Sequence, residues 1–249
     1  NKYGFIKMGF PYYGWLISIF TLVIKTAIQF EIPLIVYGED GEIEYGGSSE
    51  NLDKLIFGSE YIEKIYLEKG YKKVVKAAKL SKKQMFWFEL PKHKMKKKNF
   101  NIFLTHWSKY ENWDPYEHYL IAKNKCGLQE SKVQNSGTFT NFAQTDQDLY
   151  ALHTYLCYLK FGFGRATQDV GIEIRRGAMT RDQGLNLARA FDGMYPEAFI
   201  QKYLEYYKMS KKEFDKVLDK WANKKLFYKS KKTKKWIPKF NIGEDFYFK

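Results

Sequence analysis

A helix-length apolar run that leads directly into a short β-rich run constrains the fold of this 249-residue chain more than any other feature. Residues 14–30 (GWLISIFTLVIKTAIQF) are long enough for a buried helix, and residues 32–37 (IPLIVY) end at Gly38. Continuous apolar runs are typical of strands that are covered on both faces of a parallel sheet. A helix, a buried strand and a polar loop in this order predict one unit of a doubly wound α/β sheet, whose ligands bind beyond the carboxyl ends of the strands.

The polar loop after this strand is strongly acidic. Residues 38–47 (GEDGEIEYGG) carry Glu39, Asp40, Glu42 and Glu44. Such a loop could bind Mg²⁺, a ribose hydroxyl or ammonia, and Mg²⁺ prefers one or two carboxylates combined with substrate phosphates. The alternative is an acidic hairpin or loop that only faces solvent. Its place after the predicted strand favours a binding site.

A second motif, GFGRATQDVGIEIRR, ends at Arg176 and places arginines close to glycines. Glycines permit a tight turn, and an arginine fits a phosphate or carboxylate with two hydrogen bonds. We therefore predict a cationic turn in which Arg165, together with Arg175 or Arg176, clamps an anion. The alternative is a structural turn with an internal Arg165–Asp169 or Arg175–Glu173 ion pair.

Periodicity and capping signals predict the remaining elements. Residues 102–107 (IFLTHW) are apolar and β-rich, which predicts a second strand. Asp114 before Pro115 is typical of a helix start. Helices are predicted over residues 60–80, 116–125, 145–160, 180–191, 196–207 and 210–223. We expect residues 1–110 to form an α/β domain, and residues 111–249 a mostly helical region with a basic tail.

The charge balance is strongly basic. Lys and Arg total 42 against 28 Asp and Glu, which gives a net charge of +14. This excess predicts anionic partners: nucleotides, nucleotide sugars, nucleic acid or an acidic membrane surface. Residues 224–235 are rich in lysine with aromatic residues interleaved, as on nucleic-acid-binding surfaces, and a solvated helix face is the alternative. No RNA or DNA motif accompanies them, so nucleic acid is not expected as the partner.

Cysteine and histidine spacing argues against a metal centre and a disulfide framework. Cys126 and Cys157 lie in unrelated contexts, and the four histidines show no metal-ligand spacing. We expect two buried thiols in a reducing, cytoplasmic setting. The apolar run 14–30 is 17 residues long and contains Lys25, short of the ~20 apolar residues that a membrane span needs, so no span is expected.

Four stretches in this order resemble the N-acetyl sugar amidotransferases, a family of the PP-loop ATP pyrophosphatase superfamily. They are residues 8–15 (MGFPYYGW), 32–47 (IPLIVYGED to EYGG), 158–169 (YLKFGFGRATQD) and 173–181 (EIRRGAMTR). The resemblance covers most of the chain, up to about residue 205. It implies part of a Rossmann-like α/β sheet, as in adenine nucleotide alpha hydrolase-like proteins, with a mostly helical C-terminal region.

The resemblance also implies a reaction. Enzymes of this family modify sugars of surface polysaccharides and flagellins by converting an N-acetyl group into an acetamidino group. ATP with Mg²⁺ adenylates the amide oxygen and releases pyrophosphate, and ammonia then displaces AMP. The ammonia comes from a partner glutaminase that acts with a cyclase-like channelling subunit. The substrate is a nucleotide sugar or an acidic sugar.

Site residues follow from the matched motifs. The residues implied at the adenylate are Gly38, Glu39, Asp40 and Glu44. The residues implied in catalysis are Arg165 and Asp169. The residues implied at the sugar or its nucleotide diphosphate are Tyr45, Arg175 and Arg176. No metal-ligand set is implied, because residues 11–13 (PYY) stand where several family members have a cysteine pair.

One departure from the family pattern concerns ATP. The superfamily's phosphate loop, Ser-Gly-Gly-x-Asp-Ser, does not occur in the chain, and the nearest cluster, residues 46–49 (GGSS), follows the wrong strand. The sequence also begins at Asn1 rather than at a methionine. We therefore expect the chain to be the portion of a longer protein that follows the phosphate loop. The alternative is a chain that does not bind ATP in the usual way.

Two other functions stay open. The first is a PP-loop enzyme that modifies tRNA, in which the basic residues would contact the tRNA phosphates. Such enzymes usually need a catalytic cysteine, and neither Cys126 nor Cys157 has a persuasive setting. The second is a non-catalytic subunit that docks a glutaminase through its aromatic surface.

Overall fold

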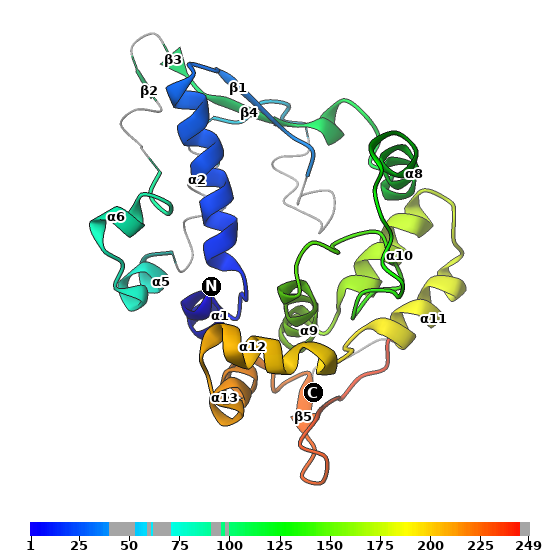
Figure 1. Cartoon of the computed structure of the whole chain (residues 1–249). Coiled ribbons are helices and arrows are strands. Elements are labelled where there is room, and N and C mark those ends of the chain that lie inside the picture. Colours follow the sequence, from blue (N-terminus) through cyan, green and yellow to red (C-terminus); the bar gives the residue numbers. More distant parts are fainter. Residues whose placement is uncertain (40–52, 59–60, 62–70, 91–95, 98–99, 245–249) are drawn as a thin grey trace. The chain divides into compact units, whose positions relative to one another are not determined.

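The computed structural model describes residues 1–39, 53–58, 61, 71–90, 96–97 and 100–244 (Figure 1). Two units make up the chain. Unit 1 consists of Asn1–Met8 and Tyr12–Trp113, and unit 2 of Gly9–Pro11 and Asp114–Lys249. Of the residues that the sequence analysis assigns to a site, Asp40, Glu44 and Tyr45 lie outside the described ranges, as does Glu42.

Unit 1 is a mixed α/β unit whose longest helix is α2, Tyr13–Gln29. The side chains that α2 buries are Tyr13, Ile17, Thr21, Ile24 and Ala27. They recur every three or four residues, as on one face of a helix. The helix predicted over residues 14–30 is therefore confirmed.

A parallel pair of strands packs against α2. β1 (Leu34–Tyr37) pairs with β4 (Phe103–His106) in parallel register, so that Tyr37 lies opposite His106. Phe57 adds an antiparallel bridge to Leu104 with two backbone hydrogen bonds of 2.8 Å. The core around this pair consists of Ile24, Ala27, Ile35, Phe57, Tyr61, Leu90, Ile102 and Leu104. Both predicted strands are therefore confirmed, and they pair in the expected direction.

The burial of β1 corrects one prediction. Ile35 is buried, whereas Leu34 and Val36 are 47% and 51% exposed. β1 is therefore covered on one face and is not the doubly covered strand that its apolar run predicts. The physical reason is that the described core, which includes Ile24 and Ala27 of α2, packs against the face of β1 that carries Ile35. A wider Rossmann-like sheet stays a prediction.

The other described elements of unit 1 are short. They are α1 (Lys2–Met8), α5 (Tyr71–Ala78), α6 (Lys82–Met85), β2 (Lys96–Lys97), β3 (Phe100–Asn101) and the 3₁₀ turn η3 (Trp107–Lys109). No single helix within the described ranges combines the length and apolar composition needed to cross a membrane, although the bent pair of α1 and α2 meets that test jointly.

Unit 2 is mostly helical. Its helices are α8 (Pro115–Cys126), α9 (Leu149–Phe161), α10 (Arg165–Arg175), α11 (Arg181–Phe191), α12 (Ile200–Tyr207) and α13 (Lys211–Trp221), with a 3₁₀ turn η4 (Glu197–Phe199). The unit ends in an antiparallel hairpin of β5 (Phe227–Lys229) and β6 (Trp236–Pro238).

The capping signals in the sequence are confirmed in unit 2. Asp114 caps α8 by accepting hydrogen bonds from the backbone of Tyr116 and Glu117, both at 3.0 Å. Complete capping boxes start α11 and α13, where Thr180 and Ser210 are the N-cap residues. These local contacts satisfy backbone N–H groups that a helix start leaves unpaired.

Three N-terminal residues belong to unit 2. The Tyr207 hydroxyl donates a hydrogen bond of 2.7 Å to the Pro11 carbonyl. The Phe10 ring lies 5.1 Å from the His153 ring in an edge-on arrangement, and the Trp221 ring packs closely against Gly9. The segment Gly9–Pro11 thus completes the surroundings of α9, α12 and α13.

Two segments differ from their sequence-based expectations. Residues 165–175 form helix α10 rather than a turn, because Ala166, Val170 and Ile172 supply a face that the unit buries. Gly162 and Gly164 lie between α9 and α10, whereas Gly171 lies within α10. The basic residues 224–235 contain β5 and the hairpin turn, in place of the solvated helix face that was the alternative to a nucleic-acid surface.

Candidate functional site

The carboxyl edge of the β1–β4 pair gathers polar groups in unit 1. Gly38 and Glu39 follow β1 directly, and His106 is the last residue of β4. The Nδ1 atom of His106 lies 2.7 Å from the Glu39 carbonyl oxygen. A carbonyl only accepts, so Nδ1 carries the hydrogen, and in the neutral ring Nε2 is then an acceptor.

The second nitrogen of His106 is enclosed. His106 is 3% exposed, and its Nε2 atom has no hydrogen-bond partner in the described part of the chain. The rings of Tyr37, Phe57 and Tyr61 surround the imidazole with centroid separations of 6.1, 5.9 and 6.5 Å. A buried acceptor without a donor costs about 1–3 kcal/mol, so this nitrogen is a candidate for a catalytic role.

His106 was not singled out by the sequence. It shows no metal-ligand spacing and appears as one of four unremarkable histidines. The signal that points to it is its position, because it ends a predicted strand and a parallel sheet binds ligands at that edge. Among the described residues, no cluster of three His, Cys, Asp or Glu side chains is suited to a metal ion.

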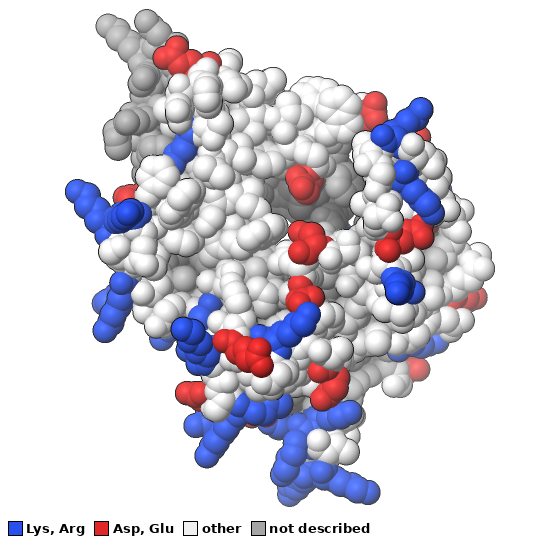
Figure 2. Space-filling model, viewed as in Figure 1, with Lys and Arg blue, Asp and Glu red and all other residues white. Residues whose placement is uncertain are grey.

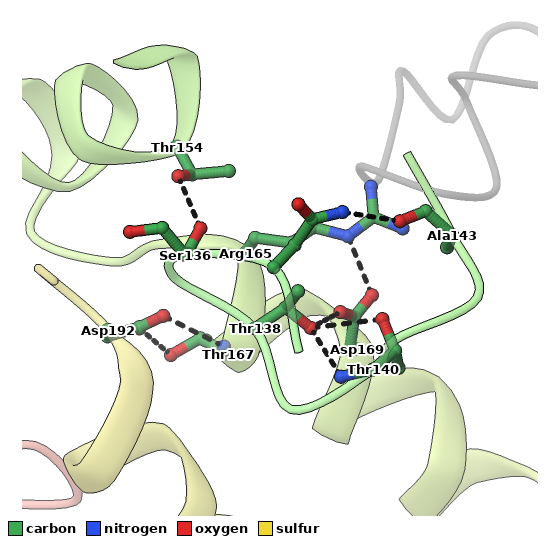
Figure 3. A network of polar contacts seen from close by, with 10 residues as sticks. Ser136, Thr138, Thr140, Ala143, Thr154, Arg165, Thr167, Asp169 and Asp192 are labelled. Carbon is green, nitrogen blue, oxygen red and sulfur yellow. Dashed lines mark hydrogen bonds and ion pairs between the residues drawn. The ribbon is translucent and has the colours of Figure 1, made fainter. Parts of the chain in front are cut away.

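A buried polar network in unit 2 holds Arg165 and Asp169 (Figure 3). The Arg165 Nε atom donates to Asp169 Oδ1 at 2.7 Å, and the Thr138 hydroxyl donates to Asp169 Oδ2 at 2.6 Å. All three residues are less than a tenth exposed. Burial raises the pKa of the Asp169 carboxyl, while Arg165 and Thr138 oppose that rise. The internal Arg165–Asp169 ion pair, one of the two alternatives read from the sequence, is therefore present.

The loop that carries Thr138 is fixed against α9 and α10. The Gly137 carbonyl accepts from the backbone of Ala166 at 3.0 Å, and the Ser136 carbonyl accepts from the Thr154 hydroxyl at 3.2 Å. Figure 3 shows the contact between Ser136 and Thr154, and Thr138 with its hydroxyl toward Asp169. The network thus orients the Arg165 guanidinium through groups on three separate segments.

A carboxylate already fills the N-terminus of α10. Asp192, just after α11, accepts from the backbone of Gly164 at 2.9 Å and of Thr167 at 3.2 Å, and from the Thr167 hydroxyl at 2.5 Å. Burial raises the pKa of Asp192, and these hydrogen bonds oppose the rise. Helix N-termini favour anions, and here the anion is internal. The backbone of the Gly162–Gly164 region is therefore not an open phosphate site.

The predicted arginine clamp is not assembled. Arg165 begins α10, whereas Arg175 ends it. Ten residues at about 1.5 Å each separate them by roughly 15 Å. Arg176 donates to Glu173 at 2.7 and 3.0 Å and to Asp114 at 3.0 Å. The ion pair that the sequence placed between Arg175 and Glu173 is thus made by Arg176, while Arg175 is exposed at the surface.

The cysteine and histidine of α9 are not activated for catalysis. The Cys157 sulfur lies 3.6 Å from His153 Nε2. Burial lowers the pKa of His153 to about 3 and raises that of Cys157 to about 11. The thiol is therefore protonated and the imidazole neutral near pH 7, which disfavours a nucleophilic cysteine of the kind that tRNA-modifying enzymes usually need.

A comparison with family models bears on unit 2. No curated protein matches the chain. Residues 136–241 match the model described as "LPS biosynthesis protein WbpG-like, C-terminal domain". The matched segment contains Thr138, Arg165, Asp169 and Asp192, the residues of the buried network. In this segment the chain is similar to the C-terminal domain of WbpG-like proteins of lipopolysaccharide biosynthesis.

Proposed function

We infer that the chain is part of an ATP-dependent amidotransferase that converts a sugar N-acetyl group into an acetamidino group during lipopolysaccharide biosynthesis. The match of residues 136–241 to the WbpG-like C-terminal domain is the observation that carries this proposal. It supports a biosynthetic role in lipopolysaccharide. The amidotransferase reaction rests on the sequence resemblance together with the chemistry of the carboxyl edge of β1 and β4.

The proposed reaction has two steps. The amide oxygen of the N-acetyl group attacks the α-phosphorus of ATP, and pyrophosphate leaves. Ammonia then attacks the imidate carbon, the carbon–oxygen bond breaks, and AMP departs with the former amide oxygen. Adenylation matters because an amide oxygen is otherwise a very poor leaving group. Ammonia is supplied by a partner glutaminase with its cyclase-like subunit.

We assign the adenylate to the edge where Gly38 and Glu39 follow β1. Gly38 leaves room for a ligand, since no other group of the described residues lies within 4 Å of where its Cβ would be. Mg²⁺ accompanies the phosphates of ATP and needs only one or two protein carboxylates. Asp40 and Glu44 are the proposed ligands, outside the described residues. Mg²⁺ supplies charge neutralisation at the phosphates.

We assign His106 to the ammonia step. Its Nε2 lone pair accepts a proton from the attacking nitrogen, while Nδ1 stays bonded to the Glu39 carbonyl. The rings of Tyr37, Phe57 and Tyr61 keep bulk water from this nitrogen. Exclusion of water suits an amidotransferase, because water would hydrolyse the adenylated sugar.

In unit 2, Arg165 and Asp169 stay candidates for catalysis, the role that the resemblance implies. Asp169, which is itself held by the Thr138 hydroxyl, orients the guanidinium and so preorganises it as a donor. Tyr45, Arg175 and Arg176 stay candidates for contacts to the sugar or its nucleotide. Arg176 is the weakest of these, since its nitrogens already bind Glu173 and Asp114.

Gene deletion tests the proposed function even when the identity of the sugar is open. In the strain that encodes the chain, deletion should replace acetamidino by acetamido groups in the surface polysaccharide, as read by mass spectrometry. Complementation with the intact gene should restore them. A wild-type polysaccharide without acetamidino groups, or an unchanged one in the deletion strain, overturns the proposal.

Complementation with variants tests His106. His106→Gln keeps a donor for the Glu39 carbonyl but has no titratable nitrogen, so acetamidino content should fall about 100-fold or more. His118→Gln on α8 is the matched control and should restore the wild-type level. The purified product of the intact gene with His106→Gln should still release pyrophosphate from ATP in the presence of the sugar, uncoupled from amidine formation. Wild-type amidination by His106→Gln contradicts the assignment.

A further inference from the structure

Unit 2 contains a pocket of about 280 Å³ that no part of the proposed mechanism uses. It lies between α9, α13, the segment before α12 and the β5–β6 hairpin. All of its lining residues, from Tyr155 to Trp236, fall within the segment that matches the WbpG-like domain. The volume lies near the lower end of the ~300–1,000 Å³ typical of small-molecule sites, which suits one sugar residue better than a whole nucleotide sugar.

One wall of the pocket is aromatic. Tyr155 and Tyr195 meet edge to face, with ring centroids 5.2 Å apart, and Trp236 lines the side formed by the hairpin. Aromatic faces carry partial negative charge, and the C–H face of a sugar ring is weakly positive, so the two stack favourably. Tyr155 is buried and packs against Tyr195, so the ring surface open to a pyranose is that of Tyr195 and Trp236, which are partly exposed.

Two of the three acidic groups that line the pocket, Asp215 and Asp219, are neutralised by lysines. Lys211 Nζ lies 2.5 Å from Asp215 Oδ1, and Lys229 Nζ lies 2.5 and 2.7 Å from the two oxygens of Asp219. These pairs carry no net charge, but they present both donors and acceptors. Sugar hydroxyls need both kinds of partner.

Two further lysines lack such compensation. Lys234 and Lys235 line the pocket from the hairpin turn, and neither side chain has a hydrogen-bond or ion-pair partner within the described ranges. From Lys208 to Lys239 the sequence holds 13 lysines and three acidic residues, an excess of ten positive charges. Figure 2 shows lysines and arginines gathered at the end of unit 2 where Figure 1 places this hairpin. Glu197 is the one carboxylate in the lining without a lysine partner among the described residues.

We propose that this pocket binds a sugar phosphate, with the sugar ring against Tyr195 and Trp236 and the phosphate at Lys234 and Lys235. Lysine binds phosphate as a point charge, and the surrounding field raises the local concentration of anions. The inference rests on the proposed function in one respect: the phosphate is taken to be the one next to the sugar in a nucleotide-sugar substrate.

Calorimetric titration of the full chain with N-acetylglucosamine 1-phosphate tests the proposal. At about 0.15 M salt, which screens distant charges, the sugar phosphate should bind more tightly than N-acetylglucosamine or inorganic phosphate alone. Lys234→Gln combined with Lys235→Gln should weaken binding about tenfold or more. Lys231→Gln combined with Lys232→Gln is the matched control, with the same charge change outside the lining, and should weaken it less than about twofold.

Three results overturn the proposal. The first is a flat titration with the sugar phosphate. The second is an equal loss in both double variants, which assigns binding to the general field rather than to the pocket. The third is equal binding of inorganic phosphate combined with unchanged affinity in Trp236→Ala, which leaves no role for the aromatic wall. Because binding is measured directly, normal binding in a protein without amidination refutes the proposed function and leaves the pocket intact.

Discussion

Single residues of unit 2 show how burial sets charge. His153 lies on α9 with its Nδ1 atom enclosed, and burial together with the positive charges of Lys160 and Arg165 lowers its pKa to about 3. An unfolded histidine takes up a proton near pH 6.5. Between these two values the unfolded state binds more protons, so His153 destabilises the fold as the pH falls.

His153 should therefore make unit 2 acid-sensitive. The free energy of unfolding should fall by about 2 kcal/mol between pH 6.5 and pH 4.5 on account of this residue. His153→Phe, which keeps a ring beside Phe10 but cannot titrate, should remove that part of the slope in urea titrations at several pH values. Cys157→Ala removes the sulfur neighbour and keeps the imidazole, so its slope should match that of the wild type. An unchanged slope in His153→Phe contradicts the assignment.

The surroundings of the Arg165–Asp169 pair show which contacts a residue pattern can predict and which it cannot. The two lie four positions apart, so an internal ion pair could be anticipated as an alternative to an anion clamp. The hydrogen bond from Thr138 to Asp169 spans 31 positions, and that from Gly164 to Asp192 spans 28. No local pattern encodes such partners, because they depend on how separate segments pack.

At the scale of elements, the loop before α9 depends on one glycine. Gly137 has a φ of +89°, and a Cβ there would lie 2.8 Å from the Thr154 hydroxyl oxygen. Gly137→Ala should destabilise unit 2 by about 2–3 kcal/mol through strain and this clash. Urea unfolding of the full chain measures the effect.

Two controls separate the causes. Gly177 has a φ of +77° with no other group of the described residues within 4 Å of its Cβ position, so Gly177→Ala should cost about 1 kcal/mol from backbone strain alone. Combining Gly137→Ala with Thr154→Ala removes the clashing oxygen, so the double variant should cost at least about 0.5 kcal/mol less than the sum of the two single variants. Strict additivity, or equal costs at both glycines, contradicts the close contact.

Elements with strong local signals could be predicted from the sequence. The capping boxes at Thr180 and Ser210 and the cap at Asp114 locate three helices, because each uses contacts within three residues. The sequence predicts a turn where α10 forms, because glycines close to arginines are typical of a turn. The burial of Ala166 and Val170, which favours the helix, depends on how the unit packs. The β5–β6 hairpin was missed because lysines dominate both its turn and its flanks.

At the scale of the whole molecule, the two units are not continuous in sequence. Gly9–Pro11 packs in unit 2, although the residues on both sides of it belong to unit 1. A division near residue 110 could be proposed from composition. The packing of Gly9–Pro11 in unit 2 could not be predicted from the sequence, because the partners of this segment lie more than 140 positions away. They are His153, Tyr207 and Trp221.

Phe10 should therefore stabilise the distant part of the chain. Phe10→Ala should lower the free energy of hydrogen exchange in α9 by roughly 1–2 kcal/mol, less than the ~3–5 of a fully buried phenylalanine. The amides of α2 should keep their protection. Phe5→Ala, which removes a buried ring of α1, is the reciprocal control and should loosen α2 but not α9. Equal loss in α2 and α9 for Phe10→Ala contradicts the division.

The hydrogen bond between Tyr207 and Pro11 also limits when unit 2 can be completed during synthesis. The two residues lie 196 positions apart. At ~5–20 residues per second, a ribosome needs roughly 10–40 s to add the intervening chain. Within that interval α9, the partner of Phe10, is made before α12, the partner of Pro11. Unit 2 thus closes only after α12 has been made, and a nascent chain stalled before α12 lacks the partner of Pro11.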